Sequence, residues 1–333
     1  MTPPRYDVVA IGNAIVDILA QADDGFIAEQ GMSKGSMQLI FSAEEADQLY
    51  AKMGPGREIS GGSAANTVAA IAALGGKTAF IGQVADDQLG QVFAHDVQSV
   101  GVDFATAARP GEPSTARCLI LVTPDGQRTM NTFLGASQFL PPHAIDEGVI
   151  RAGNILYLEG YLWDPEEPRA AMRRAMTVAR EAKRMIAFTL SDVFCISRHG
   201  DDFRQLIADG LIDILFANEA ELHTLAGTED FEAAVQEYAG KVPVLVVTRS
   251  EKGAMIMYQG VRYEIAAHPV ETVVDTTGAG DLFAAGVLYG IAQKQPIDRC
   301  LAVGAICAAE IISHYGARAE ADLKSFVMER LEA

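Results

Sequence analysis

Basic residues are scarce in this chain of 333 residues. Lysine and arginine number 26 against 44 aspartates and glutamates, which gives a formal net charge of −18. A protein that follows nucleic-acid phosphates or an anionic membrane needs a basic surface. We therefore expect no nucleic-acid partner and no membrane partner. A small phosphate-bearing ligand is not excluded, because a site for one is local.

Cysteine and histidine are too few and too irregularly spaced for a metal or disulfide framework. The four cysteines form no C-x-x-C pair and the six histidines no H-E-x-x-H motif, which excludes the common zinc patterns. No run approaches the roughly 18 apolar residues of a membrane span. Asp7 and Asp17 also interrupt the apolar core that a signal peptide would need. We expect a reduced, soluble, cytoplasmic protein, either a monomer or a homodimer.

Two familiar nucleotide loops are missing as well. The third glycine of G-x-G-x-x-G, counted from Gly278, would fall at Phe283. A Walker loop ending at Lys77 would need glycine at Ile71. The sequence has instead DTTGAGD at 275–281, which we expect to lie between a short strand and a helix.

The 275–281 stretch predicts an anion site beside an acid. Gly278 and Gly280 permit a turn that presents the amides of Gly278, Ala279 and Gly280 at the positive end of a helix. Asp281 follows directly. It is either a base that takes a proton from a hydroxyl while the amides stabilise a transferring phosphoryl group, or simply a helix cap.

The chain as a whole predicts an α/β fold. Strand and helix patterns alternate through most of it, which indicates a mostly parallel sheet covered by helices, and residues 272–274 are expected as one more strand. Residues 115–134 break the alternation as a hairpin. With 14–20 and 36–41 they are expected to form a small β-sheet lid. We find no linker or repeat, so residues 1–333 are expected to form a single domain.

Three other junctions carry residues that could bind a ligand. The glycine turn 61–66 feeds a small-residue helix, and Asn66 is placed to offer its amide to a ligand. Asn218 and Glu221 share one side of a helix start after a strand. They form either a capping box or a pair that orders the water shell of a nucleotide's Mg²⁺. The polar turn 248–253 also follows a buried strand, where α/β sheets bind ligands.

Three of these motifs, in this order, resemble the ribokinase-like (PfkB) carbohydrate and nucleoside kinases. They are Gly61 to Asn66, Asn218-x-x-Glu221 and Asp275 to Asp281, and the likeness covers nearly the whole chain. Within that family, the stretches 12–17, 158–162, 190–191 and 213–218 resemble the adenosine kinases. Thr277 departs from that narrower pattern, because many adenosine kinases carry Asn there.

The resemblance implies a role for each matching residue. It implies Asp281 as the base, the amides of Gly278, Ala279 and Gly280 as the anion hole, and Arg128 in the hairpin as added positive charge. It implies an acceptor site that comprises Asp17, Asn13, Gly61, Gly62, Ser63, Asn66 and Tyr161, with Leu39 and Phe133 as apolar lid positions. It places ATP against Asn218, Glu221, Thr248, Ser250, Gly253 and Thr277, with Mg²⁺ held through water by Glu221. Asp275, Thr277 and Gly316 resemble positions that shape a monovalent-cation loop, for K⁺.

The expected activity is ATP-dependent phosphorylation of the primary hydroxyl of a ribonucleoside, adenosine first. Apolar lid positions such as Leu39 and Phe133 favour a base over a free sugar, although they also fit a lid core. A sugar kinase acting on ribose, fructose or a sugar acid is the alternative. A nucleotide sensor without turnover is a remoter one. Trp163, the only tryptophan, is expected beside the acceptor.

Overall fold

The body of the molecule is built on a nine-stranded sheet in the order β14-β13-β12-β11-β10-β9-β1-β5-β6. The computed structural model describes residues 3–332. The strands are β1 (Tyr6–Ile11), β5 (Thr78–Ile81), β6 (Val102–Phe104), β9 (Gly153–Glu159), β10 (Met185–Thr189), β11 (Ile214–Asn218), β12 (Val244–Thr248), β13 (Ala254–Tyr258) and β14 (Val261–Ile265). All pairings are parallel except β12 with β13 and β13 with β14. The predicted α/β class with a mostly parallel sheet is confirmed.

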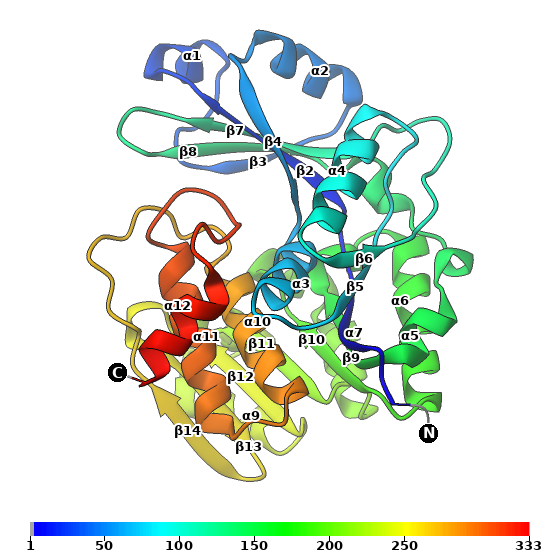
Figure 1. The fold of residues 1–333 in the computed structure, drawn as a ribbon, viewed down its shortest axis with the longest axis vertical. Helices are drawn as coiled ribbons and strands as arrows, with labels where there is room; N and C mark the ends of the chain where they lie inside the picture. The colour runs from blue at the N-terminus through cyan, green and yellow to red at the C-terminus, as the bar shows by residue number, and fades with distance from the viewer. Residues whose placement is uncertain (1–2, 333) are drawn as a thin grey trace.

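Helices cover both faces of this sheet (Figure 1). One face carries α3 (Ser63–Ala73), α4 (Gln88–Ser99), α10 (Ala279–Ala292), α11 (Ile297–Ile311) and α12 (Leu323–Glu332). The other carries α5 (Glu147–Ala152), α6 (Glu166–Glu181), α7 (Val193–Ala208), α8 (Glu219–Ala226) and α9 (Phe231–Ala239). Because both faces are buried, the strands are continuous apolar runs. Val8 and Val9 of β1, for example, point to opposite cores and are both fully buried.

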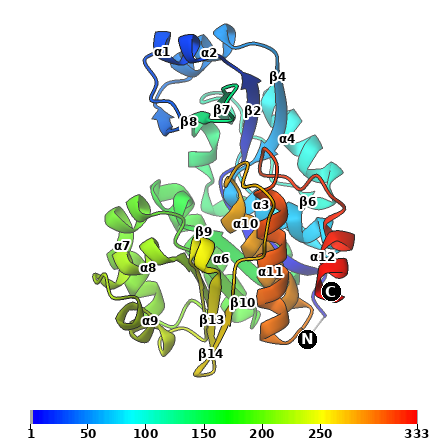
Figure 2. The ribbon, with the colours of Figure 1, turned by 90° about the vertical axis from the view of Figure 1, so that its left-hand side faces the viewer.

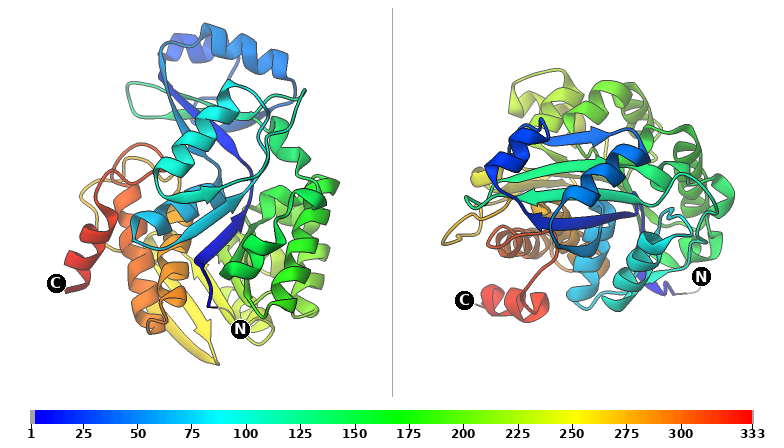
Figure 3. Two further views of the ribbon diagram at one scale, coloured as in Figure 1. Left: turned by 45° about the vertical axis from the view of Figure 1, so that its right-hand side comes forward. Right: turned by 90° about the horizontal axis from the view of Figure 1, so that it is seen from above.

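A second, five-stranded sheet forms the lid, in the order β3-β8-β7-β2-β4. Its strands are β2 (Ile15–Gln21), β3 (Met37–Ile40), β4 (Gly56–Gly61), β7 (Ala116–Val122) and β8 (Arg128–Phe133). Two short helices, α1 (Asp24–Glu29) and α2 (Ala43–Lys52), cover its outer face (Figures 2 and 3). The hairpin of β7 and β8 lies where the sequence predicts it. Strand β4 was not foreseen, because its segment opens with Gly56-Arg57-Glu58 and lacks a clear alternation.

The predicted strand at Thr272-Val273-Val274 is wrong. After β14 the chain crosses toward α10 with no neighbouring strand to pair with. Val273 is 54% exposed, and the Val274 amide donates to the carbonyl of Ile312 at 2.8 Å instead of to a sheet. Within residues 3–332, no helix is long and apolar enough to cross a membrane.

Candidate active site

The carboxyl ends of the parallel strands meet at the edge of the body sheet that faces the lid. Asn13, Glu159, Ser191, Asn218 and Thr248 lie at or just after the ends of successive strands there. Open α/β sheets bind ligands at this edge. A cavity of about 380 Å³, which we call the cleft, lies between this edge, the lid and the start of α10.

Asp281 stands in the first turn of α10 and points away from its own helix. Its carboxylate accepts hydrogen bonds from Ser63 Oγ at 2.6 Å and from Asn66 Nδ2 at 3.1 Å. The N-cap of α10 is Gly278, which makes no side-chain capping bond, so Asp281 does not act as a helix cap. Burial raises the pKa of Asp281, and the bonds from Ser63 and Asn66 oppose that rise. The carboxylate is therefore held at the cleft in a fixed direction.

The amides before Asp281 form the positive end of α10. Gly278 has φ +79°, a left-handed conformation that favours glycine. Within residues 3–332, the amides of Gly278 and Gly280 donate to no other group. Gly280 is exposed, and a side-chain carbon added there would meet nothing within 4 Å. The fold itself does not require glycine at 280, whereas a ligand that approaches this backbone closely would.

Polar groups without partners face the acceptor side of the cleft. Asn66 is 6% exposed, and its Oδ1 accepts no hydrogen bond from any residue that the structure describes. The carboxylate of Asp17, on strand β2, also lines the cleft, and burial raises its pKa to about 6. A side chain at Gly61 would meet Asp17 Oδ2 at 2.4 Å, and one at Gly62 would meet the Asn13 carbonyl at 2.1 Å. Both glycines are therefore required for Asp17 and Asn13 to pack so closely.

The lid wall of the cleft is mostly apolar, with Asp17 and Thr132 as its polar residues. Ile15, Ile120 and Met130 line it from three lid strands. Aromatic residues of the body, among them Tyr161 and Phe216, line the same cleft. A planar, partly apolar ligand fits between such walls.

Asn218 and Glu221 line the cleft and also form a capping box. The Glu221 carboxylate accepts from the Asn218 amide at 3.0 Å and from Asn218 Nδ2 at 2.6 Å, while Asn218 Oδ1 accepts from the Glu221 amide. Burial raises the pKa of Glu221 to about 7. The capping interpretation thus describes their mutual contacts. A hard oxygen donor at the cleft wall also fits hydrated Mg²⁺, which prefers carboxylates and retains water.

The loop that precedes the anion site is tied to the lid. Asp275 forms an ion pair with Arg128 of β8 and accepts from the Thr277 amide, from Thr277 Oγ1 and from the Gly316 amide. The side chains of Arg128 and Asp275 are each 7% exposed. Arg128 does not line the cleft, so in this structure it does not face the transferring group as the resemblance implies. The carboxylate of Asp275 already accepts several hydrogen bonds and does not fit a cation ligand.

The structure brings about half of the predicted site residues together at the cleft. Those that line it are Asp17, Gly62, Ser63, Asn66, Tyr161, Asn218, Glu221, Thr248, Thr277, Gly278, Gly280 and Asp281. Those that do not are Asn13, Leu39, Gly61, Arg128, Phe133, Ser250, Gly253, Asp275, Ala279 and Gly316.

Four expectations fail, three of them because the side chains have other partners. Asn13 is 4% exposed; its Nδ2 donates to Glu159 and its Oδ1 accepts from Ser137. Phe133 packs in the core on the outer face of the lid sheet. Trp163 is fully buried in the other core, where it donates to Asp202 at 2.8 Å. Leu39 is 45% exposed at the rim rather than in the cleft.

Two residues that support the site from behind, Glu159 and Arg318, are not predicted as site residues from the sequence. Glu159 is fully buried and accepts from the Asn13 and Ala64 amides, so it joins β1, β9 and α3. Arg318 contacts both the lid, at Ser60, and the body, at Ala65. A charged residue inside an apolar strand is the signal for Glu159. Nothing in the pattern around Arg318 marks it.

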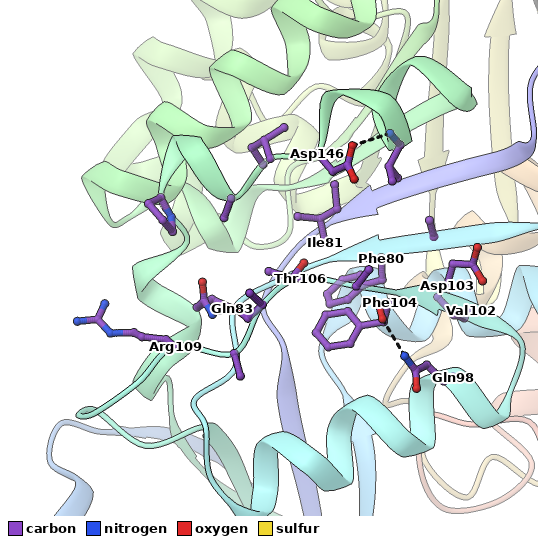
Figure 4. A pocket seen from close by; sticks show the side chains of 18 of the residues that line it. Phe80, Ile81, Gln83, Gln98, Val102, Asp103, Phe104, Thr106, Arg109 and Asp146 are labelled. Atoms are coloured by element: carbon purple, nitrogen blue, oxygen red, sulfur yellow. Dashed lines mark hydrogen bonds between the residues drawn. The ribbon is translucent and has the colours of Figure 1, made fainter.

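A larger cavity, about 1240 Å³, lies at the β6 edge of the body sheet, away from the cleft (Figure 4). Some of its polar groups already have partners, although the buried Nε of Arg109 has none among the described residues. Gln98 donates to the Phe104 carbonyl at 2.8 Å, and Asp103 accepts from Tyr6 at 2.6 Å. It does not combine a buried carboxylate with the free amides of a helix start, as the cleft does with Asp281 and α10, so size alone does not make it the candidate site.

Comparisons with known proteins agree with this geometry. The model of the pfkB family carbohydrate kinases matches residues 33–323. The structure of an adenosine kinase from Sinorhizobium meliloti is 45% identical with a TM-score of 0.90, covering 99% of this chain and all of that one. A probable sugar kinase from Rhizobium etli is 42% identical with a TM-score of 0.91 and the same coverage.

A relative of lower sequence identity is also a kinase. The ATP-dependent ribose-1-phosphate kinase of Halopiger xanaduensis is 31% identical over 280 residues, which are 83% of this chain and 89% of the relative. The match to the family model and these relatives confirm the resemblance found in the sequence. The chain belongs to the pfkB carbohydrate kinase family and is a phosphotransferase that uses an alcohol group as acceptor.

Proposed function

We propose that this protein transfers the γ-phosphate of ATP to the primary 5′-hydroxyl of a ribonucleoside, adenosine first. The observation that carries the proposal is the pairing of two unlike walls in one cleft. Asp17 and the unpartnered Asn66 Oδ1 offer acceptors to neighbouring hydroxyls, and the apolar lid wall offers a surface for a base. The 45% identity to an adenosine kinase supports the same choice.

In this proposal Asp281 is the general base. Ser63 and Asn66 hold its carboxylate toward the cleft, so one oxygen receives the proton of the attacking hydroxyl. The unpaired amides of Gly278 and Gly280 then stabilise charge on the transferring phosphoryl group. Phosphoryl transfer depends mainly on such alignment and charge stabilisation.

Other residues of the chain position ATP. Thr248 lines the cleft, while Ser250 and Gly253 shape the turn that follows it. Glu221, with Asn218, would hold Mg²⁺ through water. Bound Mg²⁺ would neutralise charge on the ATP phosphates. The Asp275 carboxylate does not fit a cation ligand, so no step is assigned to K⁺.

The second candidate is a sugar kinase of the same family. The probable sugar kinase from Rhizobium etli, 42% identical over 99% of this chain, favours it. Asp17 and Asn66 would serve vicinal sugar hydroxyls equally well, so the lid wall is the feature that separates the two candidates.

An ADP-release assay with matched acceptors tests the proposal. Adenosine, 2′-deoxyadenosine, ribose, ribose 1-phosphate and fructose are compared at one ATP concentration. We expect the highest kcat/KM for adenosine and a large loss for 2′-deoxyadenosine, because a buried acceptor group then loses its partner. Preference for a free sugar would move the protein to the second candidate, and no ADP release with any acceptor would contradict a kinase.

A single variant tests the base. Asp281→Asn should lower kcat by roughly 10²–10⁴-fold, as expected for loss of a general base, while calorimetry still detects binding of ATP and adenosine. Asp230→Asn is the matched control, because Asp230 caps α9 and lies outside the cleft. Near-normal turnover of Asp281→Asn would rule out the assigned role.

A further inference from the structure

Arg318 lies in the segment between α11 and α12 and connects the lid to the body. Its Nη2 donates to the Ser60 carbonyl at 2.7 Å and to Ser60 Oγ at 2.8 Å, at the end of lid strand β4. Its Nη1 donates to the Ala65 carbonyl at 3.2 Å, in the first turn of α3. The neighbours of Ala65 in that turn, Ser63 and Asn66, are the two residues that hold Asp281.

Among the described residues, no counter-ion contacts the charged guanidinium of Arg318. Within residues 3–332 no carboxylate oxygen lies within 4.0 Å of its guanidinium, and its buried Nε has no hydrogen-bond partner. Burial lowers the pKa of Arg318. A half-buried cation that bonds only to carbonyls and a hydroxyl costs free energy. The same three contacts could be made by a neutral donor, so the charge itself requires an explanation.

Arg318 faces Asp96 of α4 and, on the side of the acceptor site, Asp17 and Asp281. Arg318 and Asp17 line one cavity of about 340 Å³, which adjoins the cleft through Asn66 and Thr277. The positive charge of Arg318 lowers the pKa of Asp17 and of Asp281, against the larger effect of burial.

The other charges around these carboxylates do not replace Arg318. Arg128 also lowers the pKa of Asp17, but its charge is paired with Asp275. The charge of Asp281 raises the pKa of Asp17 and of Glu159. The charge of Asp96 on α4, which accepts a hydrogen bond from Ser60 Oγ, raises the pKa of Arg318. Arg57 lines the same cavity from an exposed position on β4.

We propose that Arg318 is a positioning residue for phosphoryl transfer: it fixes the first turn of α3 against the end of β4, and it supplies the positive charge that the acceptor-binding Asp17 and the base Asp281 share. The inference rests on the proposed function, because it needs Asp281 to act as the base. It assigns Arg318 no contact with substrate. Its action passes through Ser60, Ala65 and the two carboxylates.

The test is the pH dependence of kcat/KM for adenosine in Arg318→Gln, Arg318→Lys and Arg57→Gln. The acid limb of this profile reports groups of the free enzyme that must be ionised, here the coupled pair Asp17 and Asp281. Loss of a nearby positive charge raises a carboxyl pKa, typically by about 1 unit or more. The acid limb of Arg318→Gln should therefore move to higher pH by about 1 unit, with kcat/KM falling by roughly 10-fold at pH values well below the limb.

The two other variants distinguish the effect of the positive charge of Arg318 from the effect of its hydrogen bonds between α3 and β4. Arg318→Lys retains the charge and should keep the acid limb within about 0.3 units of wild type, even if loss of the planar fork lowers the overall rate. Arg57→Gln removes an arginine from the same cavity without touching α3 and should leave the limb in place. An unmoved limb in a folded Arg318→Gln, or an equal shift in Arg318→Lys, would overturn the inference.

The outcomes also separate this inference from the proposed function. If Asp281→Asn is inactive and the limb of Arg318→Gln stays unmoved, Asp281 remains the base and only the role of Arg318 falls. Should Arg318→Gln fail to fold, Arg318→Ala with added guanidinium replaces it. If guanidinium returns the acid limb of the kcat/KM profile to its wild-type pH, the inference is supported. If guanidinium restores the rate but does not move the acid limb, or restores neither, the inference is overturned.

Discussion

The body sheet and the lid sheet differ in how many of their faces are covered. Strand β1 of the body is buried at nearly every position, because helices pack on both sides. Strand β2 of the lid alternates between half-buried and buried residues, because α1 and α2 cover one face only. The exposed lid residues Met37, Leu39 and Phe41 belong to the same pattern.

Because of this difference, the body and the lid contribute different groups to the site. The body supplies the groups that need a fixed position, since the start of α10 is packed against α3 and α11. The lid supplies one uncovered face, which carries Asp17 beside apolar side chains. A sheet with an uncovered apolar face gains burial when a ligand or the body covers it. We therefore expect body residues to set global stability, and lid residues to set acceptor affinity.

Core truncations in the two sheets should give the largest difference in stability. Leu245 in β12 is fully buried, and Ile18 in β2 is 1% exposed. Leu245→Ala should lower the free energy of unfolding of the whole molecule by about 2–5 kcal/mol and leave the KM for adenosine unchanged. Ile18→Ala creates a cavity of similar size, but in the lid.

The lid truncation should therefore act locally. We expect Ile18→Ala to raise the KM for adenosine and to accelerate amide hydrogen exchange in the lid strands more than in the body strands. Denaturant unfolding followed by hydrogen-exchange mass spectrometry compares the two variants. Uniform acceleration across both sheets in Ile18→Ala would show that lid and body unfold as one unit.

The next largest effect is expected for Asp17→Asn, which should raise stability while it lowers acceptor affinity. Burial raises the pKa of Asp17 to about 6 from 3.8, so the folded protein binds this proton more tightly than the unfolded chain. The charged carboxylate thus destabilises the fold above pH 6, and this cost disappears as the pH falls below 4. Asp17→Asn should raise Tm at pH 7 and change it little at pH 4, while acceptor affinity falls and ATP affinity stays.

Thermal melts at the two pH values, with adenosine and ATP titrations at pH 7, check both halves of this expectation. A lower Tm at pH 7 would mean that Asp17 has a stabilising partner in the body. Unchanged adenosine affinity would remove Asp17 from the acceptor site.

Body and lid also differ in how well the sequence predicts them. Parallel strands such as Val244–Thr248 are continuous apolar runs bounded by helices, so their pattern identifies them. Strand β4 begins with Gly56-Arg57-Glu58 and gains its stability from pairing with β2, which no local pattern records. The strand expected at Thr272-Val273-Val274 fails for the converse reason: its residues favour a strand, but no partner lies beside it.

In the site, too, the sequence predicts residues that are close in the chain but not contacts between distant ones. Asp281, Gly278 and Gly280 are adjacent in the chain, so one motif predicts their grouping at the cleft. Glu159 and Arg318 act by contacts across at least 95 residues of sequence, to Ala64 and to Ala65, and spacing cannot reveal them. The sequence places Phe133 at the cleft, whereas the register of β8 against β7 turns its side chain to the outer face.

Glu221→Gln should have a smaller effect, confined to the body side of the cleft. If Glu221 orders the water around Mg²⁺, this change should raise the Mg²⁺ concentration needed for half-maximal rate severalfold. A neutral side chain binds hydrated cations less well, and the capping box tolerates Gln, so Tm should change little. Activity titrations with Mg²⁺, alongside thermal melts, decide between the roles. A lower Tm with unchanged Mg²⁺ dependence would leave only the capping box.

The smallest effect on stability is expected at the rim of the lid. Leu39 is 45% exposed and pairs in register with Thr132, which lines the cleft. Leu39→Ser should change the free energy of unfolding by less than about 0.5 kcal/mol, as for most surface substitutions. It should nevertheless raise the KM for adenosine, because the uncovered lid face loses apolar area that closure over a base would bury.

Phe194→Ser is the matched control, since Phe194 is 68% exposed on α7 of the body and lies outside the cleft. Steady-state kinetics with adenosine and with ribose, beside denaturant melts, measure both quantities. A KM change for Leu39→Ser that is equal for ribose and adenosine would mean that the rim contacts the sugar or sets closure, and no change at all would confine the base-binding wall to Ile15, Ile120 and Met130.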